Sequence, residues 1–200
     1  LNGGVYEEYW SNTFTRTLGS GAGQVRLIGG GSGFSENGAT GMTVRLNNNA
    51  AYEAVWGSAT FNPSTLILQS SASQNGSSLT FDNKIDLNGA DRTFSQDATS
   101  TATATIGQAI RTSSGTAGII KTGPGNLILN ATNTYNGNTT VNQGTLTANT
   151  SGALPGFGTS GKVTVAGNAT LTVRTAGWTA GNIDSLRTAA TWSAASSRLG

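Results

Sequence analysis

The chain has 200 residues, with 11 Lys and Arg against 9 Asp and Glu, 29 Gly, and neither Cys nor His. Without Cys and His, disulfides, thiolate nucleophiles, zinc clusters and His-based catalysis are excluded, and the scattered charges give no basic patch for nucleic acid. Because only 10% of the residues are charged and large apolar residues are few, the chain can order itself if those apolar side chains all point one way, as strands permit.

Short runs of alternating apolar and polar residues recur along the chain, each bounded by Gly, Asn, Ser or Asp. Each run predicts a short strand. In chain order the predicted strands are residues 24–28, 42–46, 65–69, 78–81, 84–87, 92–96, 118–121, 126–130, 139–142, 144–148, 162–166 and 169–174. The inward side chains predicted in the C-terminal half are Leu127, Leu129, Val141, Leu146, Val163, Val165, Leu171 and Val173.

Residues 182–191 have a helical pattern instead. Asn182 is the predicted N-cap, and Ile183, Leu186 and Ala190 share one face. The apolar face of this short helix predicts packing against the strands, either beside the stack or over its end.

Many short strands fit either an antiparallel sandwich or barrel, or a solenoid of stacked coils. The runs 126–130, 144–149 and 169–173 resemble one another, and their spacings along the chain fit the period of a β-solenoid coil. The sequence therefore predicts an all-β chain, one β-solenoid over residues 1–200, with about eight to ten short coils. A coil cannot bury its inner face alone, so flanking coils of a longer parent chain are the expected partners.

From Lys121 the sequence reads KTGPGNLILNATNTYNGNTTVNQGTLTA. It resembles the autotransporter-associated β-strand repeat, also called the passenger-associated transport repeat, whose pattern is approximately K-T-G-x-G-T-L-x-L, N-T-Y-x-G and T-x-V-x-x-G-T-L. Pro124 and Asn126 depart from that pattern, and the resemblance is best over residues 118–148. The matching residues are Lys121, Thr122, Gly123, Gly125, Leu127, Leu129, Asn133, Thr134, Tyr135, Gly137, Thr140, Val141, Gly144, Thr145 and Leu146.

The resemblance implies a right-handed parallel β-helix in an exported protein that is attached to the bacterial surface or released. In this family the repeat is thought to aid translocation by folding outside the cell. It implies a structural role with no catalytic residues, cofactor or metal. Tyr135 is then a stacking or corner residue, and Lys121 a solvated strand end. Exposed strand edges at the two ends of the stack predict end-to-end assembly into fibres.

Two other functions remain open at the sequence level. A polysaccharide-degrading enzyme on a β-helix would need a groove of carboxylates, for which the candidates are Asp82, Asp86, Asp91 and Asp97, with Lys84 and Arg92 nearby. An adhesin or carbohydrate-binding module would use aromatic faces beside acids, for which the candidates are Tyr6, Tyr9 and Trp10, next to Glu7 and Glu8. Surface glycans would be the ligands of such a module.

The two ends of the sequence, Leu1 to Gly4 and Arg198 to Gly200, suggest a segment cut from a longer protein. The sequence shows no signal peptide and no apolar run of membrane-spanning length, so we expect this segment not to span a membrane. The expected location is extracellular or on the bacterial cell surface.

Overall fold

The computed structural model describes residues 1–9, 12–38, 41–69, 77–98, 101–193 and 197–200. Among these residues the strands form three sheets, and neighbouring strands run parallel. The first sheet contains β1 (Val5–Glu8), β3 (Leu27–Glu36), β6 (Phe61–Leu68), β9 (Arg92–Ser95), β12 (Ile119–Thr122), β14 (Thr139–Val141), β16 (Val163–Val165) and β18 (Thr191–Trp192).

The remaining elements complete the coils. The second sheet contains β2 (Asn12–Phe14), β4 (Met42–Val44), β7 (Ser78–Phe81), β10 (Thr103–Ile106), β13 (Asn126–Leu129), β15 (Thr145–Ala148), β17 (Thr170–Val173) and β19 (Arg198–Leu199). The third sheet contains β5 (Glu53–Val55), β8 (Lys84–Asp86) and β11 (Ile110–Arg111). The helical elements are the short 3-10 turns η1 (Leu46–Asn48), η2 (Ser151–Ala153) and η3 (Thr175–Gly177), and the helix α1 (Ala180–Ala189).

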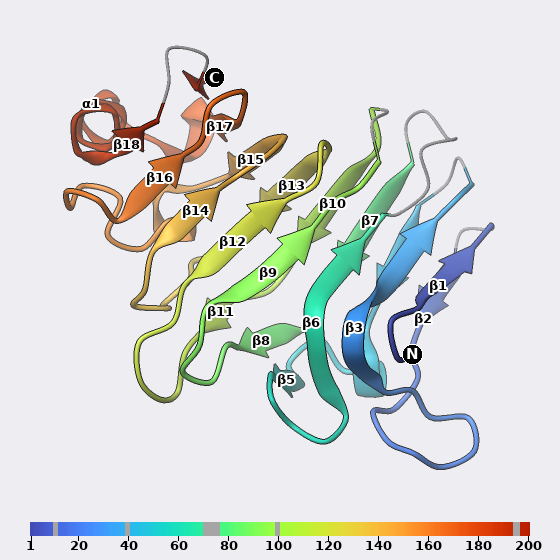
Figure 1. Cartoon of the computed structure of the whole chain (residues 1–200). Coiled ribbons are helices and arrows are strands. Elements are labelled where there is room, and N and C mark those ends of the chain that lie inside the picture. The colour runs from blue at the N-terminus through green and yellow to red at the C-terminus, as the bar shows by residue number, and fades with distance from the viewer. Residues whose placement is uncertain (10–11, 39–40, 70–76, 99–100, 194–196) are drawn as a thin grey trace.

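Each coil visits the first sheet, then the second and, in the middle of the molecule, the third (Figure 1). The coils differ in length, as the register pairs show. Ile119 pairs with Thr139 in the next coil, whereas Gly33 pairs with Ile67, which is farther away along the chain. In Figure 1 the first sheet lies in front and its strands run upward while successive coils step from right to left, so the coil is right-handed. The prediction of a parallel β-solenoid is confirmed, and the antiparallel alternative is excluded.

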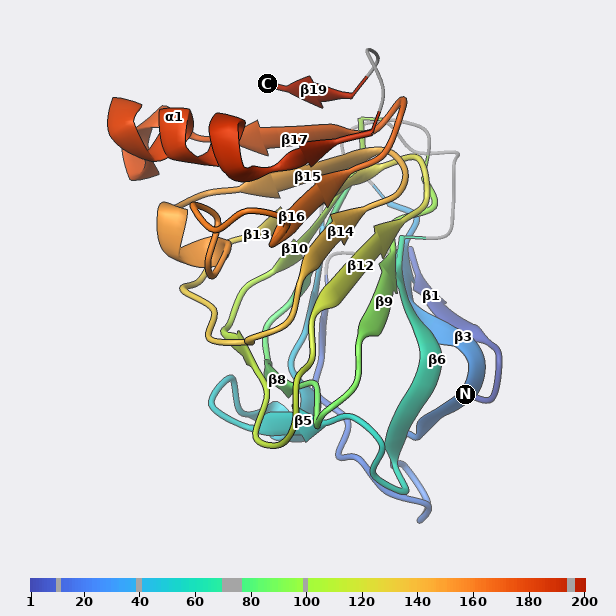
Figure 2. The ribbon, with the colours of Figure 1, turned by 60° about the vertical axis from the view of Figure 1, so that its left-hand side comes forward.

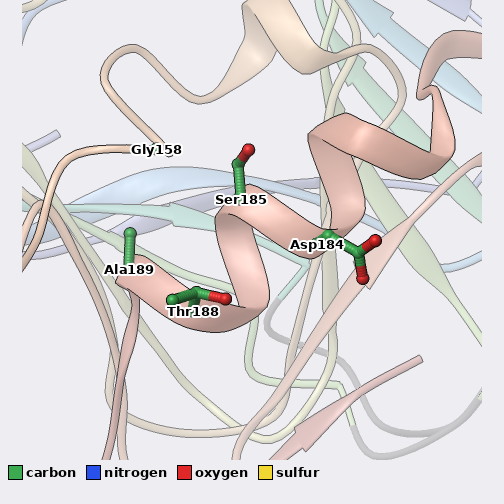
Figure 3. A pocket seen from close by; sticks show the side chains of 5 residues that line it. All are labelled: Gly158, Asp184, Ser185, Thr188 and Ala189. Carbon is green, nitrogen blue, oxygen red and sulfur yellow. The ribbon is translucent and has the colours of Figure 1, made fainter.

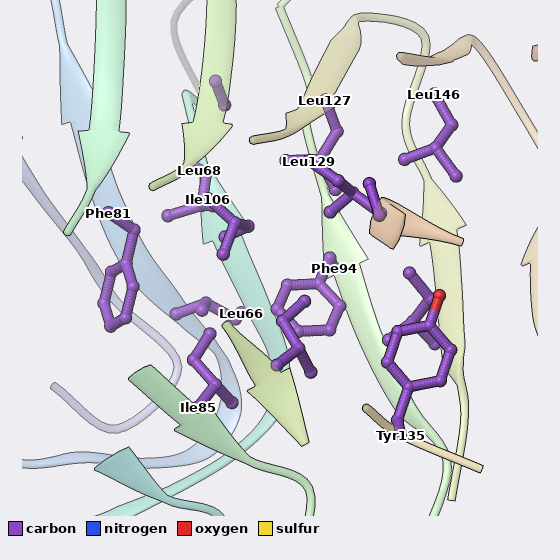
Figure 4. Packing of buried hydrophobic residues seen from close by; sticks show 14 of the residues in the cluster. Leu66, Leu68, Phe81, Ile85, Phe94, Ile106, Leu127, Leu129, Tyr135 and Leu146 are labelled. Carbon is purple, nitrogen blue, oxygen red and sulfur yellow. The ribbon is translucent and has the colours of Figure 1, made fainter. Parts of the chain in front are cut away.

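Apolar side chains from the facing sheets fill the inside of the stack. Alternate residues of a strand point to opposite faces, so one inward residue in two is enough to build a continuous core. Figure 4 shows Leu66, Phe94, Ile106, Leu127 and Tyr135 lining one continuous core, although they come from three successive coils. The residues predicted to point inward are buried except Val173, which is half-buried: Leu127, Leu129, Val141, Leu146, Val163, Val165 and Leu171.

The helix α1 lies beside the C-terminal coils (Figure 2). It begins earlier than predicted, because Thr179 and not Asn182 is its N-cap: the Thr179 hydroxyl accepts a hydrogen bond from the backbone N–H of Asn182. Asn182 is the third residue of the helix, where its side chain completes a capping box. Leu186 is fully buried and Ile183 half-buried, so the predicted apolar face does pack against the stack. Among the described residues, no helix is long and apolar enough to cross a membrane.

Candidate functional site

Lys121 lies at an inward position of β12. In the parallel ladder it stands between Phe94 of β9 and Val141 of β14, and its exposed fraction is 0%. The prediction of a solvated strand end is therefore wrong. The physical reason is the strand period of two, because Ile119 and Lys121 must share one side of β12 and Ile119 belongs to the core.

The ammonium group of Lys121 holds the corners of two coils together. Its Nζ donates hydrogen bonds to the carbonyl oxygens of Thr122 at 2.6 Å, Gly123 at 2.7 Å and Gln143 at 3.1 Å. Thr122 and Gly123 lie at the end of β12, whereas Gln143 follows β14 in the next coil. Burial lowers the pKa of Lys121 to about 8, and the charge of Asp97 acts in the opposite direction.

The corners that receive this ammonium stack too closely for side chains. Gly123 has φ of 76° and Gly144 has φ of 66°, a region that favours glycine. A Cβ on Gly144 would lie 2.5 Å from the carbonyl oxygen of Gly123 in the preceding coil. Glycine at both corners therefore lets successive coils sit at normal ladder distance with the lysine between them.

Asn133 ties three coils together at the opposite corner. Its Oδ1 accepts from the N–H of Ile110 at 2.8 Å, and its Nδ2 donates to the carbonyl oxygen of Ala153 at 2.8 Å. Ile110 belongs to the coil before and Ala153 to the coil after. The next residue, Thr134, donates its backbone N–H to the Ile110 carbonyl oxygen at 2.9 Å. This corner continues the line of the third sheet without a regular strand.

Tyr135 lies in the core with 1% of its surface exposed (Figure 4). Its hydroxyl and the Thr139 hydroxyl are 2.6 Å apart and hydrogen-bonded. Burial raises the pKa of Tyr135 well above its ordinary value, although the bond to Thr139 acts against this rise. Both observations make Tyr135 a neutral packing residue at neutral pH.

The other residues of the repeat pattern have packing or corner positions. Leu127, Leu129, Val141 and Leu146 are core residues. Gly137 sits against the backbone of Ala117, where a Cβ would clash. The remaining members face outward or lie at corners and are Thr122, Gly125, Thr134, Thr140 and Thr145.

The aromatic residues proposed for ligand contact lie at the N-terminal end of the stack. Tyr6 is 37% exposed, and its ring packs against Phe14 at 5.0 Å between centroids while its hydroxyl donates to Glu8 at 2.8 Å. Tyr9 is 59% exposed. Trp10 lies outside the described residues, so the structure places two members of the predicted trio and does not test their role.

Two of the carboxylates proposed for an enzyme groove form links between coils. Asp82 accepts from Arg45 at 2.6 Å and from Gln108 at 2.8 Å, which belong to the coils before and after it. Asp86 lies 3.4 Å from Arg111. Burial acts to raise the pKa of Asp86, but hydrogen bonds to its carboxylate and the charge of Arg111 together lower it below its ordinary value.

The other two carboxylates are also engaged. Asp91 accepts from the backbone N–H of Gly118 at 2.7 Å, and Asp97 accepts from the Ser95 hydroxyl. The two basic candidates of that groove have other surroundings. Lys84 is exposed, and the guanidinium of Arg92 lies over Trp56 and donates a hydrogen bond to the Leu87 carbonyl. Within the residues that the structure describes, no group of three or more His, Cys, Asp or Glu is placed to hold a metal ion.

An ion pair between Arg111 and Glu53 had no signal in the sequence, since 58 residues separate them. Only the register of β5, β8 and β11 brings them together with Asp86. This contact belongs to the links between coils.

A shallow hollow of about 400 Å³ lies against α1 (Figure 3). It is lined by Gly158, Asp184, Ser185, Thr188 and Ala189. Asp184 forms an ion pair with Arg187 on the same helix at 3.4 Å. The lining described for this hollow is largely exposed and shows no group of side chains arranged to bind a ligand.

The fold and the two bonded corners define a parallel β-solenoid whose polar inward residues join one coil to the next. Residues 119–148 match the passenger-associated-transport-repeat family, so the chain carries this repeat in the two coils that contain Lys121, Asn133 and Tyr135. That family is a structural repeat and not an enzyme family, and the match confirms the resemblance seen in the sequence. Comparison with curated proteins and with solved structures gave no match.

Proposed function

We propose that this chain is a structural segment of an exported bacterial passenger, which supports translocation by folding coil upon coil outside the cell. The observation that carries the proposal is the pair of bonded corners. Lys121 and Asn133 reach carbonyl and N–H groups of neighbouring coils, so the coil that carries them is completed only when the next one docks. Folding that proceeds by docking can advance in one direction from the first coil that leaves the membrane.

The energetics support the same role. Each docked coil gains a row of backbone hydrogen bonds and buries its inward apolar residues against the preceding coil. A coil that slides back would lose both gains, so folding outside opposes backward movement without ATP. The family match implies export, and surface display is the destination we propose.

Surface delivery of corner variants tests this proposal. The chain is exported as the passenger of a bacterial surface-display system, and the protease-accessible fraction on intact cells is measured over time. Asn133→Ala, which removes the three-coil bridge, should reduce that fraction several-fold relative to the exposed-site control Asn138→Ala. Equal delivery of the two variants, once Asn133→Ala is known to be less stable in solution, would contradict coil docking as the driving step.

One observation favours end-to-end assembly as an additional function. Tyr6 and Phe14 are core-facing residues that stay partly exposed at the N-terminal end of the stack. A second copy that adds its last strands to β1 and β2 would cover them. Electron microscopy at rising protein concentration should then show rods that lengthen, whereas rods of constant length would count against assembly.

A further inference from the structure

The outward face of the second sheet carries two straight columns of hydroxyl-bearing side chains. The register places one residue of each strand directly over its counterpart in the next coil. One column contains Ser78, Thr103, Asn126, Thr145 and Thr170. The other contains Thr43, Thr80, Thr105, Ile128, Thr147 and Thr172. These eleven residues are called the threonine array below, and nine of them are Thr or Ser.

The array is a two-dimensional lattice. Neighbours along a column belong to successive parallel strands and are about 4.8 Å apart, whereas the two columns are two residues apart along each strand, roughly 6.6 Å. Threonine is branched at Cβ and restricted at χ1, so its hydroxyl and methyl groups can repeat in the same orientation from coil to coil. Figure 2 shows the strands β10, β13, β15 and β17 that carry most of this lattice stacked in sequence.

The eleven side chains of the array are uncharged, and the first column continues past Thr170 to the exposed Arg198 in the last strand of the sheet. Ser78 is exposed, and the other members are half-buried except Thr147, which is 3% exposed. Thr147 is also the one member whose hydroxyl has a described protein partner, since it donates to Asn126 Oδ1 at 2.9 Å.

The chemistry of the array points to one kind of ligand. Ions and charged polymers need charges, and sugars are usually held against aromatic rings, but the eleven residues include neither. Hydroxyls that alternate with methyls at fixed spacing can hold a layer of water molecules in fixed positions. The two spacings are close to repeat distances in the oxygen lattice of hexagonal ice.

We propose that the threonine array of the second sheet binds the surface of ice. Water ordered by the hydroxyls would merge with the crystal lattice, and the methyl groups would exclude disordered water from the contact. The coil that contains the transport repeat interrupts the array, because β13 presents Asn126 and Ile128 where its neighbours present Thr. The proposal goes beyond a role in export and does not depend on it.

The first sheet provides a matched control face. Its outward residues Thr65, Thr93, Thr140 and Thr164 also form a column, interrupted by Ile120. The column next to it includes Ile67, Ser95 and Thr122, and the last two hydroxyls are turned to protein acceptors, Asp97 and the Phe94 carbonyl. This face therefore has single hydroxyls in a line and not a two-dimensional lattice.

The test measures partition of the purified chain into a slowly growing ice hemisphere, together with inhibition of ice recrystallisation. The wild-type chain should enter the ice, Thr105→Lys should reduce incorporation at least ten-fold, and Thr93→Lys on the control face should stay within two-fold of wild type. The double change Asn126→Thr with Ile128→Thr completes the lattice and should increase the effect at least two-fold. Circular dichroism melting confirms that each variant is folded.

Three outcomes would overturn the proposal. The first is exclusion of the wild-type chain from ice, to the same extent as a globular protein of similar size. The second is equal loss in Thr105→Lys and Thr93→Lys. The third is evidence of another partner for the array. Such evidence would be a change of the sedimentation mass of the protein in Thr105→Lys alone, or binding of the wild type to crystalline cellulose or chitin in place of ice.

Discussion

Lys121 is a charged side chain at a buried position of the core. Its stem replaces an apolar residue in the column between Phe94 and Val141, and its ammonium reaches three carbonyl oxygens at the corners of two coils. A buried cation is stable only when such acceptors surround it. The lysine thus holds the end of β12 to the segment that follows β14 in the next coil.

Replacing Lys121 tests this arrangement. Lys121→Met keeps the apolar stem but leaves the three carbonyls without their shared donor, so we expect the free energy of unfolding to fall by about 1–3 kcal/mol at neutral pH. Urea unfolding followed by circular dichroism measures the difference. A variant as stable as wild type would show that the carbonyls find other donors at no cost.

The alkaline pH dependence adds a second test of the same residue. The pKa of Lys121 is about 8 in the folded chain and 10.5 as its ordinary value, so the unfolded chain binds more protons between these limits. Stability of the wild type should therefore rise relative to Lys121→Met as pH increases from 8 to 10.5, by up to about 3 kcal/mol. Ionisation of Tyr135 in the unfolded chain lowers stability above pH 10 in both proteins, so its effect cancels in the difference. A gap that stays constant with pH would contradict the lowered pKa.

At the scale of elements, hydrogen bonds at the corners of the coils should stabilise the fold as the strands do. Asn133→Ala removes an acceptor from the Ile110 N–H and a donor from the Ala153 carbonyl, both at a buried position. We expect a loss of about 2–4 kcal/mol in the free energy of unfolding, and faster hydrogen exchange at the amide of Ile110. The exposed neighbour Asn138, changed to Ala, should stay within about 0.5 kcal/mol of wild type. Similar losses in both variants would mean that the bridge adds no stability.

Most strands could be predicted from the sequence because their inward residues are large. All twelve predicted ranges overlap a strand of the structure. Among the described residues seven strands were missed. β1, β2, β18 and β19 lie at the ends of the stack, β10 has only Ala104 and Ile106 on its inward side, so its apolar alternation is weak, and β5 and β11 depend on the register of the stack. Lys121 was misplaced because charges on strands are usually exposed, although its alternation with Ile119 carried the signal.

Contacts that depend on register could not be predicted. The third sheet places Glu53 and Arg111 in contact across two intervening coil boundaries, and the unequal lengths of the coils hide that register in the sequence. The same variation hid the threonine array. Its members are separated by unequal intervals along the chain and become a lattice only when the strands are aligned.

At the scale of the whole molecule, a stack of coils has contacts mainly between nearest neighbours. Its stability is then approximately a sum over coils and the interfaces between them, so damage to one coil should remain local. Leu127 lies in a middle coil, buried between Ala104 and Leu146 of the adjacent coils. Its position makes it a suitable probe of how far a local loss spreads.

Leu127→Ala should cost about 2–5 kcal/mol at its own coil through lost burial and the cavity left behind. Hydrogen exchange measured by mass spectrometry should show lost protection in residues 119–130 and in the adjoining coils, while residues 61–69 keep theirs. The matched change Leu66→Ala, at an equally buried position in an earlier coil, should move the loss to that coil. If both variants instead lost protection evenly along the chain, the stack would unfold as one unit. Coil-by-coil docking would then lack the partly folded states through which a passenger could fold progressively during export.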